Sequence, residues 1–325
     1  MPYTNPHPDI SLAGAQLLFQ QTYDDIAKND TVGFLYRYLT TGTLETQPLI
    51  GTGSVLTDEA RTGPKEHQDF STVKKNLVHY PWYSAFKADA RDQLYNLVTQ
   101  ININNFAAEA AKAYFWNKFM LVQAAIVGGA STTFTYRGRV IDNTAYDAKA
   151  LFANDHSWGS SGSNDNLLTY TGTTDAQILA DYNTALIAFR GFKNNRGEKL
   201  YPYDLPNVKY WVLASPAIGG YLRNFFFKTE RAANGSTNPI YRAVEGIIDL
   251  PNQTGNVWYL YRDDGSENHR PVTVSDVGAV VQKALGPMFG GLESEESYDA
   301  GISKISWEWE RGCCIGDPLS IVKLA

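Results

Sequence analysis

The sequence predicts a mixed α+β fold, and three patterns indicate it. Apolar residues keep helical spacing over about residues 105–127. A second helix begins with a capping box at Thr174. Near the C-terminus Ile305, Trp307 and Trp309 alternate with polar residues, which is the period of a strand. Because 325 residues exceed the roughly 250–300 that one core serves, we expect two lobes that share a wall, or two domains.

Composition places the chain among ordinary globular proteins. It is 43% hydrophobic and 19% charged, and its 13% aromatic residues supply large side chains for a core and then for interfaces. The formal net charge is −6 and the sequence pI is about 5.4. Since no basic stripe is present to neutralise phosphates, direct gripping of DNA is not expected.

Cysteine usage and the N-terminal sequence bear on the compartment. Cys313 and Cys314 are adjacent, which excludes a disulfide framework and suits a metal site poorly, so we expect buried thiols in a reducing compartment. The first residues carry no cationic start and no apolar run, so no secretory signal is expected. The most apolar stretch, 119–127, is too short to span a membrane. These features predict a soluble protein made in the cytoplasm.

The N-terminal third predicts a helix, a loop and strands. Residues 9–29 have a loosely amphipathic helical pattern, and 31–41 is rich in strand formers. The polar stretch 43–68 lacks clear structure and is either a functional loop or a surface excursion. Strand-like segments follow over 71–88, where Pro81 restricts the chain to a sheet edge or a bend.

The long helix has an expected start and stop. Asn105 is a plausible N-cap, and Gly128 with Gly129 supplies the stop, giving a rod of roughly 35 Å at about 1.5 Å per residue. The helix is apolar nearly all round, so it should be buried on more than one side. A strand pair is expected next, over 132–140.

The remaining elements follow in order. The sequence predicts a polar loop over 159–172, a capped helix from Thr174 to Gly191, a strand over 208–213, a helix with Ser215 as cap and Pro216 first, strands over 246–250 and 256–261, and a turn at Asp264-Gly265.

The segment from Asp147 to Trp158, with Asn166-Leu-Leu-Thr169 shortly after it, resembles the Mu-like major head subunit family of tailed bacteriophages. The pattern around Leu205-Pro-Asn-Val208 and Ser215-Pro-Ala217 is similar to that family's entry into its axial domain. The segment Arg311 to Asp317 departs from the family pattern. The resemblance implies the Hong Kong 97-type capsid fold, an α+β architecture with an N-terminal arm, an extended loop, a peripheral domain with a long spine helix, and an axial domain.

The resemblance also implies domain bounds. They are an N-terminal arm at 1–42, the extended loop at 43–70, the peripheral domain at 71–205 with the spine helix at about 105–127, the axial domain at 206–300, and a C-terminal strand at 301–325 that returns to the peripheral domain.

The function that the resemblance implies is that of a major capsid protein. Such a chain self-assembles as hexamers and pentamers of an icosahedral shell that encloses double-stranded phage DNA without sequence-specific contact. The expected partners are a separate scaffolding protein or protease, a portal and a decoration protein. No association with a membrane is expected. The protein would reside in the virion, and in the host cytoplasm during assembly. The alternatives are an encapsulin-like compartment shell and, less favoured, a hydrolytic enzyme.

Motifs for catalysis are weak. Gly51-Thr-Gly53 lacks the third glycine of a dinucleotide fingerprint, and Gly159-Ser-Ser-Gly162 is out of register with a nucleophile elbow and is expected to be a loop. The histidines never occur at the i, i+4 spacing of a zinc site; they are His7, His67, His79, His156 and His269. No catalytic, cofactor-binding or metal residue is predicted.

Three features have two interpretations each. His156 follows Asp155, which would raise its charged fraction, but a histidine that holds its loop by local hydrogen bonds is favoured. The carboxylates of 263–267 could meet a cation, although turn formation explains them more simply. Some shells of this fold crosslink through lysine, and lysines flank the loop here, but we do not predict the crosslink; they are Lys65, Lys74 and Lys75.

Overall fold

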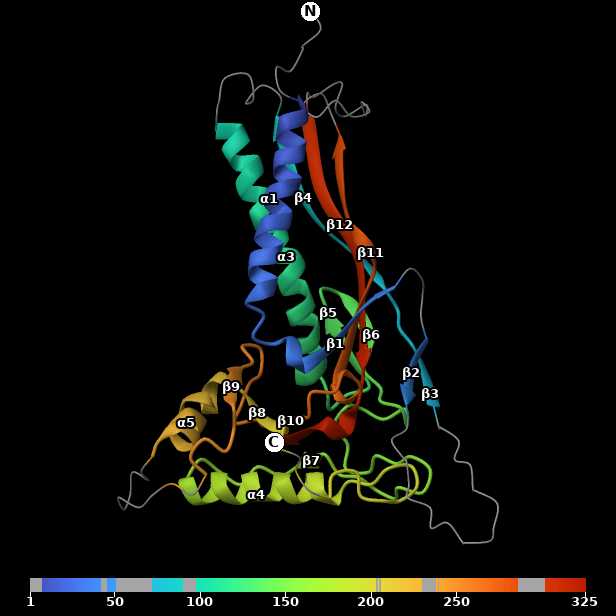
Figure 1. The fold of residues 1–325 in the computed structure, drawn as a ribbon, viewed down its shortest axis with the longest axis vertical. Coiled ribbons are helices and arrows are strands. Elements are labelled where there is room, and N and C mark those ends of the chain that lie inside the picture. The colour runs from blue at the N-terminus through green and yellow to red at the C-terminus, as the bar shows by residue number, and fades with distance from the viewer. Residues whose placement is uncertain are drawn as a thin grey trace, which may run out of the picture.

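The computed structural model describes residues 8–41, 46–50, 72–89, 98–202, 204, 206–229, 238, 240–285 and 302–325. These residues form an elongated upright body and a second body at its foot (Figure 1). Each body has a sheet and a hydrophobic cluster. None of the helices within these ranges is long and apolar enough to cross a membrane.

The upright body packs two helices against one face of a four-stranded sheet (Figure 1). Its strand order is β1-β11-β12-β4, with β1 parallel to β11 and the other pairs antiparallel. The elements are α1 (Pro8–Lys28), α3 (Val98–Val127), β1 (Tyr36–Thr41), β4 (Tyr80–Asp89), β11 (Val272–Leu285) and β12 (Ile302–Ile315).

The inner face of β12 confirms the predicted alternation. Ile305 and Trp307 are fully buried and Trp309 is nearly so, whereas Ser306, Glu308 and Glu310 alternate with them on the other face. From α1, Phe19 stacks on the Trp307 ring with centroids 5.6 Å apart, and Gln16 accepts a hydrogen bond from its indole. The helix expected at 9–29 is therefore held to the sheet by an aromatic contact.

The long helix α3 ends where the sequence predicts but starts earlier. Asn105 is not its N-cap, because the helix begins at Val98 and Asn105 lies inside it. Ile103 is buried in the core, so packing extends the helix beyond the local cap signal. At the other end, side chains on Gly128 and Gly129 would collide with Phe134 and Phe152, so these glycines serve packing as well as helix termination.

The second body has a five-stranded sheet in the order β7-β13-β10-β8-β9 and two helices. The capping box of its first helix is confirmed, because Thr174 and Gln177 bond each other reciprocally. The elements are α4 (Asp175–Gly191), α5 (Pro216–Phe227), β7 (Leu167–Leu168), β8 (Lys209–Ala214), β9 (Gly246–Asp249), β10 (Trp258–Asp263) and β13 (Ile321–Leu324). Helix α5 begins at Pro216 as expected, although the Ser215 hydroxyl bonds Gly255 and does not cap it.

The second sheet is the wall that the two bodies share. On β10, Trp258 and Leu260 belong to the cluster of the second body, whereas Tyr259 and Tyr261 belong to the cluster of the first. Since neighbouring residues of a strand point to opposite faces, this sheet is buried on both sides. Of the two arrangements expected from chain length, the structure has two lobes with a common wall.

Two short ribbons and three single turns complete the fold. They are β2 (Thr46–Ile50) with β3 (Thr72–Asn76), β5 (Thr133–Tyr136) with β6 (Arg139–Asp142), and η1 (Gly33–Leu35), η2 (Glu267–His269) and η3 (Pro318–Ser320). The expectation that 43–68 lacks structure is wrong at β2, and residues 51–71 lie outside the described ranges. Strand β4 is an edge strand, as Pro81 predicts.

The grouping of elements by core differs from the expected bounds of 71–205 and 206–300. Helix α4 packs in the second cluster, and β11 pairs in the first sheet. The reason is that the chain crosses between the sheets more than once, so contiguous ranges do not describe either body.

Candidate functional site

A buried ion pair lies at the centre of the upright body. Arg311 on β12 is 1% exposed, and its Nε and Nη2 donate to the two carboxylate oxygens of Asp276 on β11 at 2.6 and 2.7 Å. This bidentate geometry is the strongest form of an arginine–carboxylate pair. The remaining guanidinium nitrogen, Nη1, donates to the carbonyl of Tyr114 on α3 at 2.6 Å.

Neighbouring side chains complete this pair. The hydroxyls of Tyr38 and Tyr114 each donate to Asp276 at 2.7 Å. Asn117 accepts from Arg311 at 3.3 Å and from the Trp309 indole at 3.2 Å. These bonds join β1, α3, β11 and β12, so the cluster holds the sheet and the long helix together and offers no open position to a substrate.

The electrostatics of the cluster follow from burial and pairing. Burial alone would raise the pKa of Asp276, but the hydrogen bonds and charge of Arg311 hold it below its ordinary value. Burial, with the charge of Asp276, raises the pKa of Tyr38 to about 12 and that of Tyr114 further. The aspartate therefore stays ionised and both tyrosines stay neutral donors.

A second buried cation lies beside this cluster. Lys118 on α3 is 7% exposed, and its Nζ lies 4.9–5.0 Å from the ring centroids of Tyr36, Tyr38 and Phe115. Asp30 is 3.9 Å from that Nζ, and burial lowers the lysine pKa. Aromatic faces stabilise a cation in this position.

His156 holds its loop locally, as favoured, but Asp155 is not its acidic partner. Its Nδ1 lies 3.0 Å from Asp147, nine residues earlier, and its Nε2 lies 3.1 Å from the carbonyl of Leu151. The ring is fully buried, and Asp155 pairs with Lys149 at the surface. Both ring nitrogens therefore lie within hydrogen-bond distance of oxygen atoms of the same loop, which fixes the orientation of the ring. The adjacent Asp155 was the partner expected from sequence, because no local pattern shows that the loop folds Asp147 back onto the ring.

The other candidate site residues that the structure describes form turns, core contacts or loops. Asp263 and Asp264 accept from the backbone of Gly265 and Ser266, which confirms the turn interpretation. The side chains of Cys313 and Cys314 are buried and form no disulfide. The segment Gly159–Gly162 is a loop, and both glycines have positive φ.

Several candidates cannot be placed. Gly51, Gly53, His7, His67 and Lys65 lie outside the described ranges. Lys74 and Lys75 lie on β3. His79 and His269 lie before β4 and on η2, so the structure brings none of the described histidines together.

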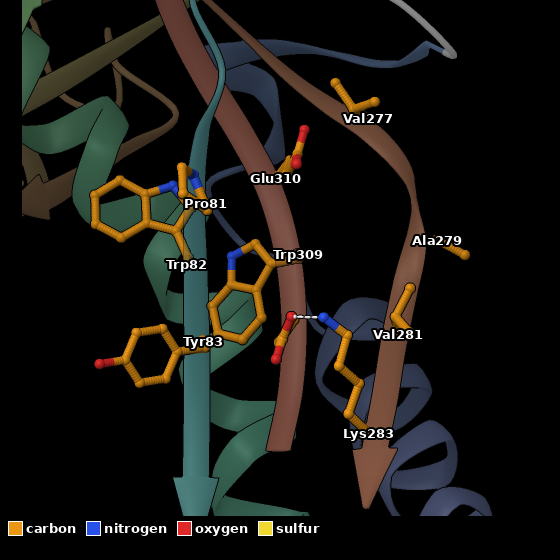
Figure 2. A pocket seen from close by; sticks show the side chains of 10 residues that line it. Pro81, Trp82, Tyr83, Val277, Ala279, Val281, Lys283, Trp309 and Glu310 are labelled. Atoms are coloured by element: carbon orange, nitrogen blue, oxygen red, sulfur yellow. Dashed lines mark hydrogen bonds and ion pairs between the residues drawn. The ribbon is translucent and has the colours of Figure 1, made fainter.

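A surface groove lies on the face of the first sheet that points away from the helices (Figure 2). It has a volume of about 330 Å³ and is lined by Pro81, Trp82, Tyr83, Val277, Ala279, Val281, Lys283, Glu308, Trp309 and Glu310. We call it the outer groove. Tyr83 is 72% exposed and Val281 is 52% exposed. No local sequence pattern indicates the outer groove, because its lining comes from three strands that are far apart in the chain.

A bulge in β11 widens the outer groove. Val277 pairs with Glu310 and Val281 pairs with Glu308, so three residues of β11 have no partner on β12. Gly278 has a φ of 70° at this point, and Figure 2 shows β11 bending away from β12. The sequence signal for it is one glycine inside an otherwise strand-like run.

The described residues contain no group of three or more histidine, cysteine or acidic side chains that could hold a metal ion. The polar side chains of the Arg311–Asp276 cluster bond one another and join elements of the fold. The outer groove is different, because its side chains are open to another molecule. It is therefore the candidate functional surface.

No family model and no curated protein matches the chain. Solved structures do match. A chain in the structure described as Mycobacterium phage Patience has a TM-score of 0.51 and 11% identity, over 95% of this chain and 87% of that one. The capsid structure of the Cyanophage P-SCSP1u has a TM-score of 0.48 and 12% identity, over 89% and 86%. The virus-like particle from Pyrococcus furiosus has a TM-score of 0.47 and 10% identity, over 96% and 98%. The first likeness shows a shared mixed helix-and-sheet fold.

Proposed function

We propose that this chain is the major capsid protein of a tailed phage or prophage, and that its copies assemble into an icosahedral shell around phage DNA. The observation that carries the proposal is the fold likeness, over 95% of the chain, to a chain of the Mycobacterium phage Patience structure. The resemblance of the segment from Asp147 to Trp158 to the Mu-like head subunit family points the same way. Function follows from where such a subunit meets its neighbours.

In this proposal the upright body is the peripheral domain of a Hong Kong 97-type fold, and α3 is its spine helix. The second body, with α4 and α5, is the axial domain. The β2–β3 ribbon belongs to the extended loop, and residues 1–42 form the N-terminal arm, whose α1 and β1 pack on the peripheral domain. The ribbon projects from the body, which supports this assignment (Figure 1).

The surface supports assembly on several sides. A shell subunit needs contacts in more than one direction, and large exposed apolar side chains mark such contacts. On this chain they occur on both bodies: Leu17, Val78, Tyr83, Trp116, Val140 and Val281 lie on the upright body, and Ile187, Tyr221, Phe227 and Tyr241 lie on the second. A single interface would not explain this distribution.

The remaining partners follow from the same proposal. A separate scaffolding protein or protease would direct closure, a portal would occupy one vertex, and a decoration protein could bind outside. The net charge of −6 favours contact with DNA that is neither tight nor sequence-specific. The mature protein would reside in the virion, after assembly in the host cytoplasm.

The proposal is tested on the purified full chain by light scattering and negative-stain imaging, alone and with a crowding polymer. Hollow polygonal particles of megadalton mass are expected. Nuclease-protected DNA inside particles from the host would indicate a phage head, and a defined protein cargo would indicate an encapsulin-like compartment. A compact dimer or tetramer that never forms larger species would contradict a shell protein.

A further inference from the structure

The outer groove has an acidic side chain without a described counter-ion. Lys283 pairs with Glu308, as the dashed line in Figure 2 shows. Glu310 is exposed, lies between Pro81 and Val277 in the sheet, and pairs with no cation of the described residues. The groove therefore combines an apolar surface, from Tyr83 and Val281, with one unneutralised carboxylate.

The turn between β5 and β6 carries exposed positive charge. Arg137 and Gly138 both have positive φ, 47° and 77°, which is the narrow two-residue hairpin turn. Arg137 and Arg139 are exposed, and each guanidinium lies over a tyrosine ring of its own chain, at 5.8 and 5.7 Å. Neither pairs with a carboxylate of the described residues. Val140 beside them is 62% exposed.

The turn and the groove lie on opposite sides of β4 and do not meet within one chain. Tyr80 at the start of β4 donates to the carbonyl of Val140 at 3.1 Å, and Arg139 lies over the Tyr80 ring. These contacts hold the hairpin on the helix side of β4, and no residue of the turn lines the groove. A cationic turn on one side of the sheet and an acidic groove on the other side are complementary between two copies.

We propose that the outer groove receives the β5–β6 turn of a second copy of this chain. Arg137 of one copy pairs with Glu310 of the next, and Val140 packs on Tyr83 and Val281. A groove of about 330 Å³ is at the small end of binding sites, which suits the side chains of a turn better than a helix. The proposal rests on the proposed function, because only an assembling chain repeats this contact.

The test exchanges the two charges of the proposed pair. The measured quantity is the total protein concentration at which half of the protein molecules are in particles. Arg137→Glu and Glu310→Arg are each expected to raise this concentration about 5-fold, since each loses an exposed pair and adds a repulsion. The double variant, with the charges exchanged, is expected to return within about 2-fold of the wild type. Lys199→Glu, an exposed reversal on the second body, is the matched control.

The outcomes separate the inference from the function. If particles form but the double variant assembles no better than the single ones, the contact is wrong and the shell is not. If the wild type never assembles, the proposed function fails first. A second measurement does not depend on particle yield. The Arg137→Cys and Glu310→Cys variants are each shown by circular dichroism to be folded, and are then mixed under oxidising conditions. A covalent dimer that forms only in the mixture supports the contact, and its absence contradicts it.

Discussion

At the residue scale, the buried Arg311–Asp276 pair shows how a polar group is kept in an apolar core. Taking two charges out of water is costly, and only a complete set of hydrogen bonds offsets it. Here both carboxylate oxygens and all three guanidinium nitrogens have partners, and the bonds involve residues of β1, α3, β11 and β12. The pair therefore specifies how the helix sits on the sheet.

Removing one partner of the Arg311–Asp276 pair should lower the free energy of unfolding more than removing both partners. Arg311→Met leaves Asp276 buried without its counter-charge, so the free energy of unfolding should fall by about 3–5 kcal/mol. The double variant Arg311→Met/Asp276→Leu should recover much of that loss, because no charge remains buried. Chemical denaturation of the three proteins measures this. A double variant as unstable as the single one would contradict the account.

At the element scale, local signals predicted α4 and α5 almost to the residue, since caps and proline act within a turn. They failed at the start of α3 and missed β11 altogether. The bulge at Gly278 interrupts the alternation of β11, so its two halves do not read as one strand. Its length is set by its pairing with β12, which is remote in sequence.

The path of β12 also depends on one close approach. A Cβ on Gly312 would lie 2.2 Å from the carbonyl oxygen of Val78, so the two backbones can pass only with glycine here. Gly312→Ala should therefore cost about 1–3 kcal/mol of stability. Gly220→Ala on α5 is the matched control, because a Cβ there meets open space and alanine favours a helix by up to about 1 kcal/mol. Thermal melts of both variants test the contrast, and equal effects would refute it.

At the scale of the whole molecule, the chain crosses between the two sheets twice in one place. One crossing joins β10 to β11 and the other joins β12 to β13, and they are tied where Gly316 and Asp317 donate to the carbonyls of Pro271 and Arg270, both at 2.9 Å. Beside them Asp264 lies 2.6 Å from Nδ1 of His269. This junction relates the orientation of one body to that of the other.

The junction should respond to pH. Burial alone would lower the pKa of His269, but the hydrogen bond to Asp264 and the charge of Asp317 raise it above its ordinary value. Because folding raises the pKa of His269, its protonation stabilises the folded state. This stabilisation is complete below about pH 6.5 and is lost as the pH rises through the pKa of His269 in the folded state. The wild type should thus lose stability relative to His269→Gln as the pH rises above about 6.5. Parallel pH dependences in denaturant titrations would rule this out.

Short-range patterns were sufficient for the α+β class, for most helices and strands, for the inner face of β12 and for His156 as a residue that holds its loop. These depend on interactions within a few residues, which the order of amino acids specifies directly. The ion pair at Arg311, the Asp147 partner of His156, the shared wall and the outer groove required the folded chain. The ion pair, the wall and the groove join residues from separate segments, and the Asp147 partner depends on how the loop between residues 147 and 156 folds back on itself.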